Sequence, residues 1–159
     1  ALGNTAMQDD KGHERAKEHY LNALELFVND NDWKGEAVAL QNLGFLEPVY
    51  SDEKKQLYLR SLAIFRENGD YSGEADALNK LGWTARTLEE KENWYRESLR
   101  IWRKAGDKEG ESNTLYRIVL LLKRKGLDDD ESKTMLSNAH KIRQEIGIPT
   151  PQWFWNLLG

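Results

Sequence analysis

The stretch GEAVALQNLG, residues 35–44, returns twice further along the chain, and this recurrence decides the fold. The later copies read GEADALNKLG at 73–82 and GESNTLYRIV at 110–119. Gly35 and Gly73 are 38 residues apart, and Gly73 and Gly110 are 37 apart. A period of this length is longer than a leucine-rich repeat and shorter than most propeller blades, which leaves helical repeats as the best match.

A second stretch precedes each copy and indicates that every unit holds two helices. It reads YLNALELF at 20–27, YLRSLAIF at 58–65 and YRESLRIW at 95–102. Its apolar residues recur at helical steps, and no alternating strand pattern is present. A fainter fourth copy, NAHKIRQEIG, occupies 138–147.

Short polar turns separate the units. Gly69-Asp70 and Gly106-Asp107 precede the second and third copies, and an Asn-Asp pair precedes the first. Glycine supplies the left-handed conformation that ends a helix, and aspartate caps the next one. We expect helices near 1–9, 13–30, 33–47, 52–67, 72–87, 90–105, 108–125, 129–146 and 151–158. Pro48 should end the third of these.

These motifs resemble the tetratricopeptide (TPR) repeat. In that family one helix carries a bulky residue followed by Leu-Gly, as Leu40 with Leu43-Gly44 does here, and Leu78 with Leu81-Gly82. The other helix carries a small residue before leucine, as Ser61 does. The third unit has Val119 in place of the glycine.

The resemblance implies an all-α fold, a right-handed superhelix of antiparallel helix pairs that forms an α-solenoid. We expect one domain over 1–159. It would hold a partial repeat at 1–32, repeats at about 33–70, 71–107 and 108–147, and a terminal or capping helix at 148–159. Both ends fall inside the Leu-Gly helix, which suggests a piece of a longer array.

In such arrays the Leu-Gly helices line the concave face, where a partner binds. Counting from each Leu-Gly pair, the resemblance implies a partner-binding row of Asn4, Gln41, Asn42, Phe45, Asn79, Lys80, Trp83, Arg86, Asn113, Tyr116 and Arg117. Asparagine and arginine suit peptide backbone and carboxylate recognition. Trp83, Phe45 and Tyr116 could anchor a ligand, while Trp83 and Tyr116 could equally pack between repeats.

Some TPR domains bind the C-terminal carboxylate of a chaperone with a two-carboxylate clamp, which is a set of asparagine and basic side chains. Asn4, Asn42 and Lys80 match part of that set. One clamp lysine position holds Asp76, whose charge would repel a carboxylate. The sequence therefore argues against a chaperone-tail receptor.

The composition excludes several other functions. The net charge of −4 lacks the basic excess of a nucleic-acid binder, and the absence of cysteine removes thiolate metal sites and fits a cytoplasmic location. No apolar run could span a membrane. His13 and His19 are six apart and do not form a zinc-protease pair, His140 is solitary, and the acidic run 128–131 lacks a calcium-loop pattern. We expect no enzyme, metal or cofactor.

The sequence therefore predicts a protein-binding or peptide-binding module. The alternative is a sensor domain of a larger signalling protein, such as an ATPase, a protease or a transcription regulator, because similar repeats are fused to such effectors. The aromatic segment Trp153–Trp155 is expected to cap the solenoid. It could instead join two copies of the chain into a homo-oligomer, since uncapped solenoid edges self-associate.

Overall fold

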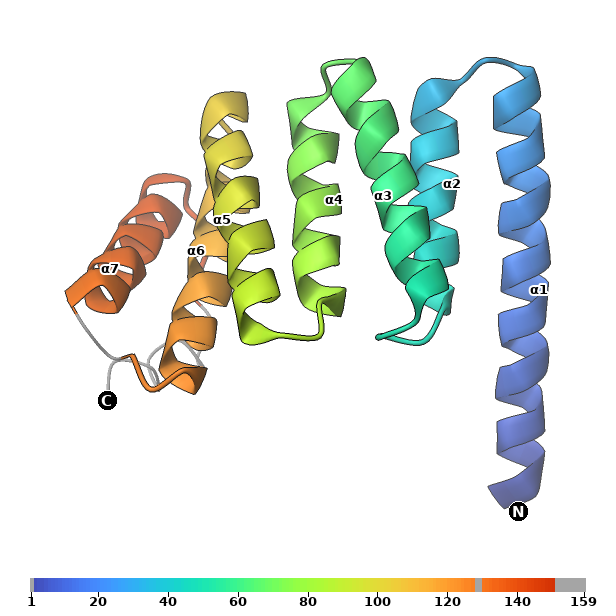
Figure 1. Cartoon of the computed structure of the whole chain (residues 1–159), viewed down its shortest axis with the longest axis horizontal. Coiled ribbons are helices and arrows are strands. Elements are labelled where there is room, and N and C mark those ends of the chain that lie inside the picture. The colour runs from blue at the N-terminus through green and yellow to red at the C-terminus, as the bar shows by residue number, and fades with distance from the viewer. Residues whose placement is uncertain (1, 128–129, 151–159) are drawn as a thin grey trace.

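The computed structural model describes residues 2–127 and 130–150, with side chains from residue 11 onward. Within these residues the chain is all-helical. The helices are α1 (Leu2–Asn29), α2 (Trp33–Leu46), α3 (Asp52–Glu67), α4 (Tyr71–Thr84), α5 (Leu88–Ala105), α6 (Lys108–Arg124) and α7 (Asp130–Glu145). Each helix packs on the next one in the chain, and α4 also contacts α6 (Figure 1). The all-α prediction is confirmed for the described part of the chain.

The turns between units have the predicted chemistry. Asp32, Asp70 and Asp107 accept hydrogen bonds from the backbone of Gly35, Gly73 and Gly110, at the starts of α2, α4 and α6. The residues just before these aspartates, Asn31, Gly69 and Gly106, have positive φ angles of 56°, 69° and 72°. The three recurring motifs therefore begin the even-numbered helices at matched positions.

Two kinds of close contact between glycine and an aromatic ring set the helix spacing. Phe27, Phe65 and Trp102 lie against Gly35, Gly73 and Gly110, so that a Cβ on these glycines would meet the rings at 2.2–2.4 Å. A Cβ on Gly44 or Gly82 would meet the ring of Tyr58 or Tyr95 at 2.6 or 2.5 Å. The leucines that accompany them, including Leu40, Leu78 and Leu81, are almost fully buried and form the core.

Several predicted boundaries were wrong. The break expected between 9 and 13 does not exist, because α1 continues through Gly12, and a single exposed glycine weakens a helix without ending it. Helix α4 ends at Thr84 rather than near 87, since Thr87 caps the next helix by accepting from the Glu90 N–H at 3.1 Å. The helix expected at 151–158, with Trp153–Trp155, lies outside the described residues.

Other boundaries agree with the sequence. Helix α2 stops just before Pro48, with Glu47 in an extended conformation. Helix α6 ends at Arg124, and Gly126 follows with φ 76°. The faint fourth copy lies within α7 and the turn after it.

Candidate interaction surface

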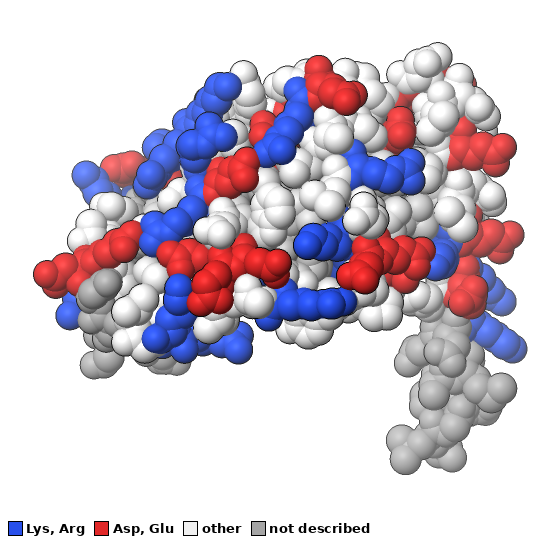
Figure 2. All heavy atoms as spheres, in the orientation of Figure 1, with Lys and Arg blue, Asp and Glu red and all other residues white. Residues whose placement is uncertain are grey.

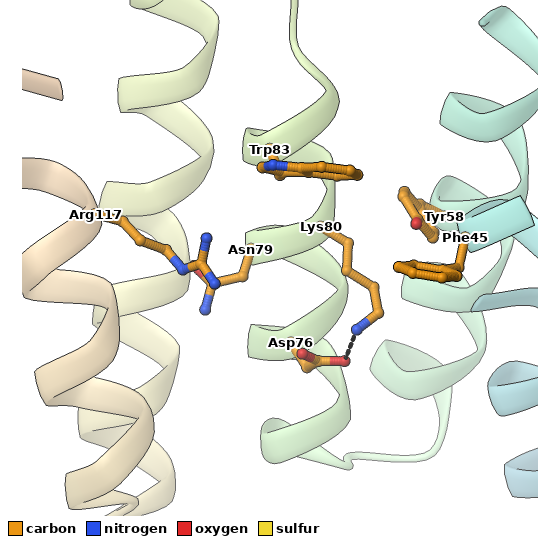
Figure 3. A pocket seen from close by; sticks show the side chains of 7 residues that line it. All are labelled: Phe45, Tyr58, Asp76, Asn79, Lys80, Trp83 and Arg117. Atoms are coloured by element: carbon orange, nitrogen blue, oxygen red, sulfur yellow. Dashed lines mark hydrogen bonds and ion pairs between the residues drawn. The ribbon is translucent and has the colours of Figure 1, made fainter. Parts of the chain in front are cut away.

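Nine of the eleven residues of the predicted partner-binding row lie on α2, α4 and α6, while Asn4 lies on α1 and Arg86 in the turn between α4 and α5. Two hollows lie along this row. We call the first the aromatic hollow. It has a volume of about 220 Å³, and Figure 3 shows its lining residues Phe45, Tyr58, Asp76, Asn79, Lys80, Trp83 and Arg117. Five of these seven residues belong to the row derived from the Leu-Gly register.

Two exposed aromatic side chains border the aromatic hollow. Phe45 on α2 is 71% exposed and Trp83 on α4 is 43% exposed. They occupy equivalent places, one residue after the Leu-Gly pairs Leu43-Gly44 and Leu81-Gly82. Large apolar side chains in neighbouring units that stay open to solvent are typical anchors for a partner.

The polar groups of the aromatic hollow are partly satisfied within it. Lys80 donates to Asp76 at 2.8 Å along α4 (Figure 3). Asn79 donates to the Thr114 hydroxyl of α6 at 2.9 Å. Burial, together with the charge of Asp76, raises the pKa of Tyr58 to about 12. Lys80 is therefore already neutralised by Asp76, and Tyr58 is a neutral wall at any ordinary pH.

The second hollow, which we call the basic hollow, has a volume of about 500 Å³ and shares Trp83 and Arg117 with the first. Four cationic side chains line it: Arg86, Lys91, Arg117 and Arg124. The remaining wall is apolar or aromatic and includes Val49, Tyr50, Leu88, Tyr95, Leu120 and Leu121. No carboxylate lines it among the described residues.

Two lysines, one buried and one half-buried, contact the C-terminal ends of α2 and α4 beside this surface. Lys54, 1% exposed, donates from α3 to the carbonyls of Glu47 and Phe45. Lys91 donates from α5 to the carbonyls of Trp83 at 2.9 Å and Gly82 at 3.4 Å. Burial lowers the pKa of both ammonium groups. Each cation meets the unpaired carbonyls at a helix C-terminus, where positive charge is favoured.

Sequence reasoning missed these lysines. A signal was available, because Lys54 and Lys91 lie 37 residues apart and four residues before Tyr58 and Tyr95. Tyr58 was also missed as a wall of the aromatic hollow, since it belongs to α3 and not to the Leu-Gly helices.

The rest of the predicted row divides between core and surface. Gln41 is 7% exposed, and Asn42 is half-buried. Tyr116 is 2% exposed, so it packs in the interior and is not available as a ligand anchor. The Arg143 guanidinium lies 5.9 Å from its ring. Exposed Asn113 accepts a hydrogen bond from Arg143 at 2.9 Å. Asn4 lies in α1, outside the residues whose side chains are described.

The described part of the chain shows no metal site, and the face drawn in Figure 2 shows no patch of a single charge. Acidic and basic side chains are interspersed over the face in Figure 2. Among residues 11–127 and 130–150, no three His, Asp or Glu side chains are grouped as a metal site would require. His140 instead lies 3.0 Å from the Thr150 hydroxyl.

No helix in the described part of the chain combines the length and apolar character needed to cross a membrane. The chain matches no known protein-family model, and no curated protein is significantly similar to it.

Proposed function

We propose that the chain is a TPR-like array that binds a segment of another protein or a peptide, and that it is not an enzyme. The observation that carries this proposal is the pair of exposed aromatic side chains, Phe45 and Trp83, at equivalent places around an open hollow. A preformed hollow with a few apolar anchors and scattered polar groups suits recognition of a ligand.

The helix order supports the solenoid part of the proposal. Sequential packing, with an additional contact between α4 and α6, is what a superhelix of helix pairs requires, because its alternate helices line one face. On this proposal α2, α4 and α6 form the inner face, and the units at about 33–70, 71–107 and 108–147 are its repeats. The lack of cysteine supports a cytoplasmic setting.

The test is selection from a library of displayed random peptides with the purified chain as bait, followed by affinity measurements on the selected peptides. We expect Phe45→Ala and Trp83→Ala to weaken binding by about tenfold or more each, as loss of a buried aromatic anchor does. Leu26→Ala is the matched control, because Leu26 is 62% exposed on α1 and lines neither hollow.

Two results would overturn the proposal. One is a selection that enriches no peptide, and the other is a set of peptides whose affinity is equal for the Trp83→Ala, Phe45→Ala and unsubstituted chains.

A further inference from the structure

The basic hollow carries a charge that the described residues leave uncompensated. Arg117 and Arg124 are exposed on α6 and form no ion pair with any described carboxylate. The neighbouring basic residues differ, since Lys125 is paired with Glu92 at 2.8 Å and Arg96 with Glu92 and Glu131. Arg15, Arg60 and Arg100 also form no ion pair with a described carboxylate, but they line neither hollow. Arg117 and Arg124 are therefore the arginines that bring unpaired positive charge to this surface, in a chain whose net charge is negative.

The spacing along α6 places Arg117 and Arg124 on one face of the helix, with an apolar side chain between them. Residues seven apart lie two turns apart on the same helical face, about 10 Å along the axis. Leu120, which is 40% exposed, lies between them, and Trp83 faces the same hollow from α4. The surface thus alternates cation, apolar side chain and cation along a stretch that an extended segment of three or four residues could follow.

The other two cations of the hollow are held in place by the protein. Lys91 is fixed by the carbonyls at the end of α4, and burial and then the nearby charge of Arg124 lower its pKa. Arg86 donates to the Tyr50 carbonyl at 2.8 Å and to Asp52 at 3.2 Å. The Asp52 side chain is 88% exposed, so this ion pair is weak and open to competition from a ligand anion.

We infer that the basic hollow binds an acidic segment of a partner protein, in which Asp or Glu side chains flank an apolar or aromatic residue. The carboxylates would pair with Arg117 and Arg124, and the apolar residue would lie between Trp83 and Leu120. Arginine is suited to this role because its planar donors engage a carboxylate in two parallel hydrogen bonds. This inference rests on the proposed function and adds the chemistry of the partner.

The aromatic hollow is the less suitable place for such an anion. Its lysine, Lys80, is already paired with Asp76, and the Asp76 carboxylate lines that hollow. The Lys80–Asp76 pair has no net charge to attract an acidic ligand, whereas four cations and no described carboxylate line the basic hollow. The negative charge of a bound segment is therefore expected at the basic hollow.

The experiment repeats the peptide selection with two baits, the unsubstituted chain and the double variant Arg117→Glu, Arg124→Glu. We expect the unsubstituted chain to enrich Asp and Glu next to Leu, Phe or Trp. The double variant should bind those peptides about tenfold or more weakly and should enrich Lys and Arg instead. The variant Arg60→Glu, Arg100→Glu is the control, because it reverses two exposed arginines that form no ion pair with a described carboxylate and line neither hollow.

Circular dichroism of each variant verifies that it is folded. If the double variant is unfolded, Arg117→Gln and Arg124→Gln take its place, with the same loss of acidic peptides expected.

The outcomes separate this inference from the proposed function. Two outcomes would overturn the inference and leave the proposed function standing. In one, the selected peptides depend on Trp83 but contain no excess of Asp and Glu. In the other, they bind the double variant as tightly as the unsubstituted chain. Failure to enrich any peptide would overturn both. Tighter binding of oligothymidine than of the selected peptides, abolished by the double variant, would assign the hollow to single-stranded nucleic acid and overturn the acidic-segment inference.

Discussion

Gly82 and Tyr95 show how single residues set the distance between helices. The ring of Tyr95 on α5 lies so close to α4 that a Cβ at position 82 would be 2.5 Å from its Cε1 atom. Gly44 and Tyr58 make the same contact one unit earlier. The third unit has Val119 at the glycine position and Ser132 at the tyrosine position, and both are buried. In this unit the larger side chain therefore lies on α6, at the position of glycine in the other units, and the smaller one lies on α7, at the position of tyrosine.

We predict that Gly82→Ala destabilises the fold by about 1–3 kcal/mol, because the added methyl group displaces a buried ring. Gly12→Ala is the matched control, since Gly12 lies in a helix with nothing within 4 Å of an added Cβ. That change should stabilise the chain by about 0.5–1 kcal/mol through helix propensity. Urea unfolding followed by circular dichroism measures both, and a neutral or stabilising Gly82→Ala would contradict this account of the spacing.

Lys54 connects the end of one helix to the start of the next. It lies in the first turn of α3, where a positive charge is unfavourable for that helix, but its ammonium group meets the last carbonyls of α2. Burial lowers its pKa, so the cation bears a desolvation cost that the carbonyl hydrogen bonds offset. The loop around Pro48 is thereby held beside Phe45, at the edge of the aromatic hollow.

Lys54→Met is expected to lower the free energy of unfolding by about 1–3 kcal/mol, because it leaves the part-buried carbonyls of Phe45 and Glu47 without this donor. Lys55→Met provides the comparison, since Lys55 is the next residue and is exposed, and its change should stay within about 0.5 kcal/mol. Thermal or urea denaturation of the two variants gives the difference. Equal stabilities would show that Lys54 is dispensable as a link between α2 and α3.

Across the whole molecule, stability depends on neighbours in sequence. Helix α1 packs on α2 and α7 packs on α6, whereas α4 packs on α3, α5 and α6 (Figure 1). Three side chains of α1, Leu21, Leu26 and Val28, remain about half exposed or more. In an array of this kind each unit is stabilised mainly by its immediate neighbours.

Native-state hydrogen exchange should therefore be graded along the chain. We expect the slowest amide exchange in α4 and α5 and faster exchange in α1, because local opening takes less free energy where fewer apolar contacts are lost. Mass spectrometry of proteolytic fragments after timed exchange resolves the helices. Equal protection of all the helices would indicate one cooperative unit and would contradict the graded picture.

The sequence by itself determined the helical class, the order of the helices and most of their ends. Those features depend on local signals: apolar spacing, the Asp caps at 32, 70 and 107, and the left-handed turns. The break predicted near Gly12 was wrong, because one glycine costs a helix little free energy compared with what the other residues of α1 contribute. Register also placed Phe45, Trp83 and Arg117 on one surface, since the side-chain direction on a helix follows from its period.

Only the tertiary structure decided which of these side chains remain open and which are already engaged. Tyr116 and Gln41 share the register of the surface row but are buried by the packing between helices. Lys80 is paired with Asp76, whereas Arg117 and Arg124 have no ion pair with a described carboxylate and lie beside an apolar wall. Such differences arise from contacts between residues up to about one repeat apart, because burial and ion pairing depend on distances that helix periodicity does not fix.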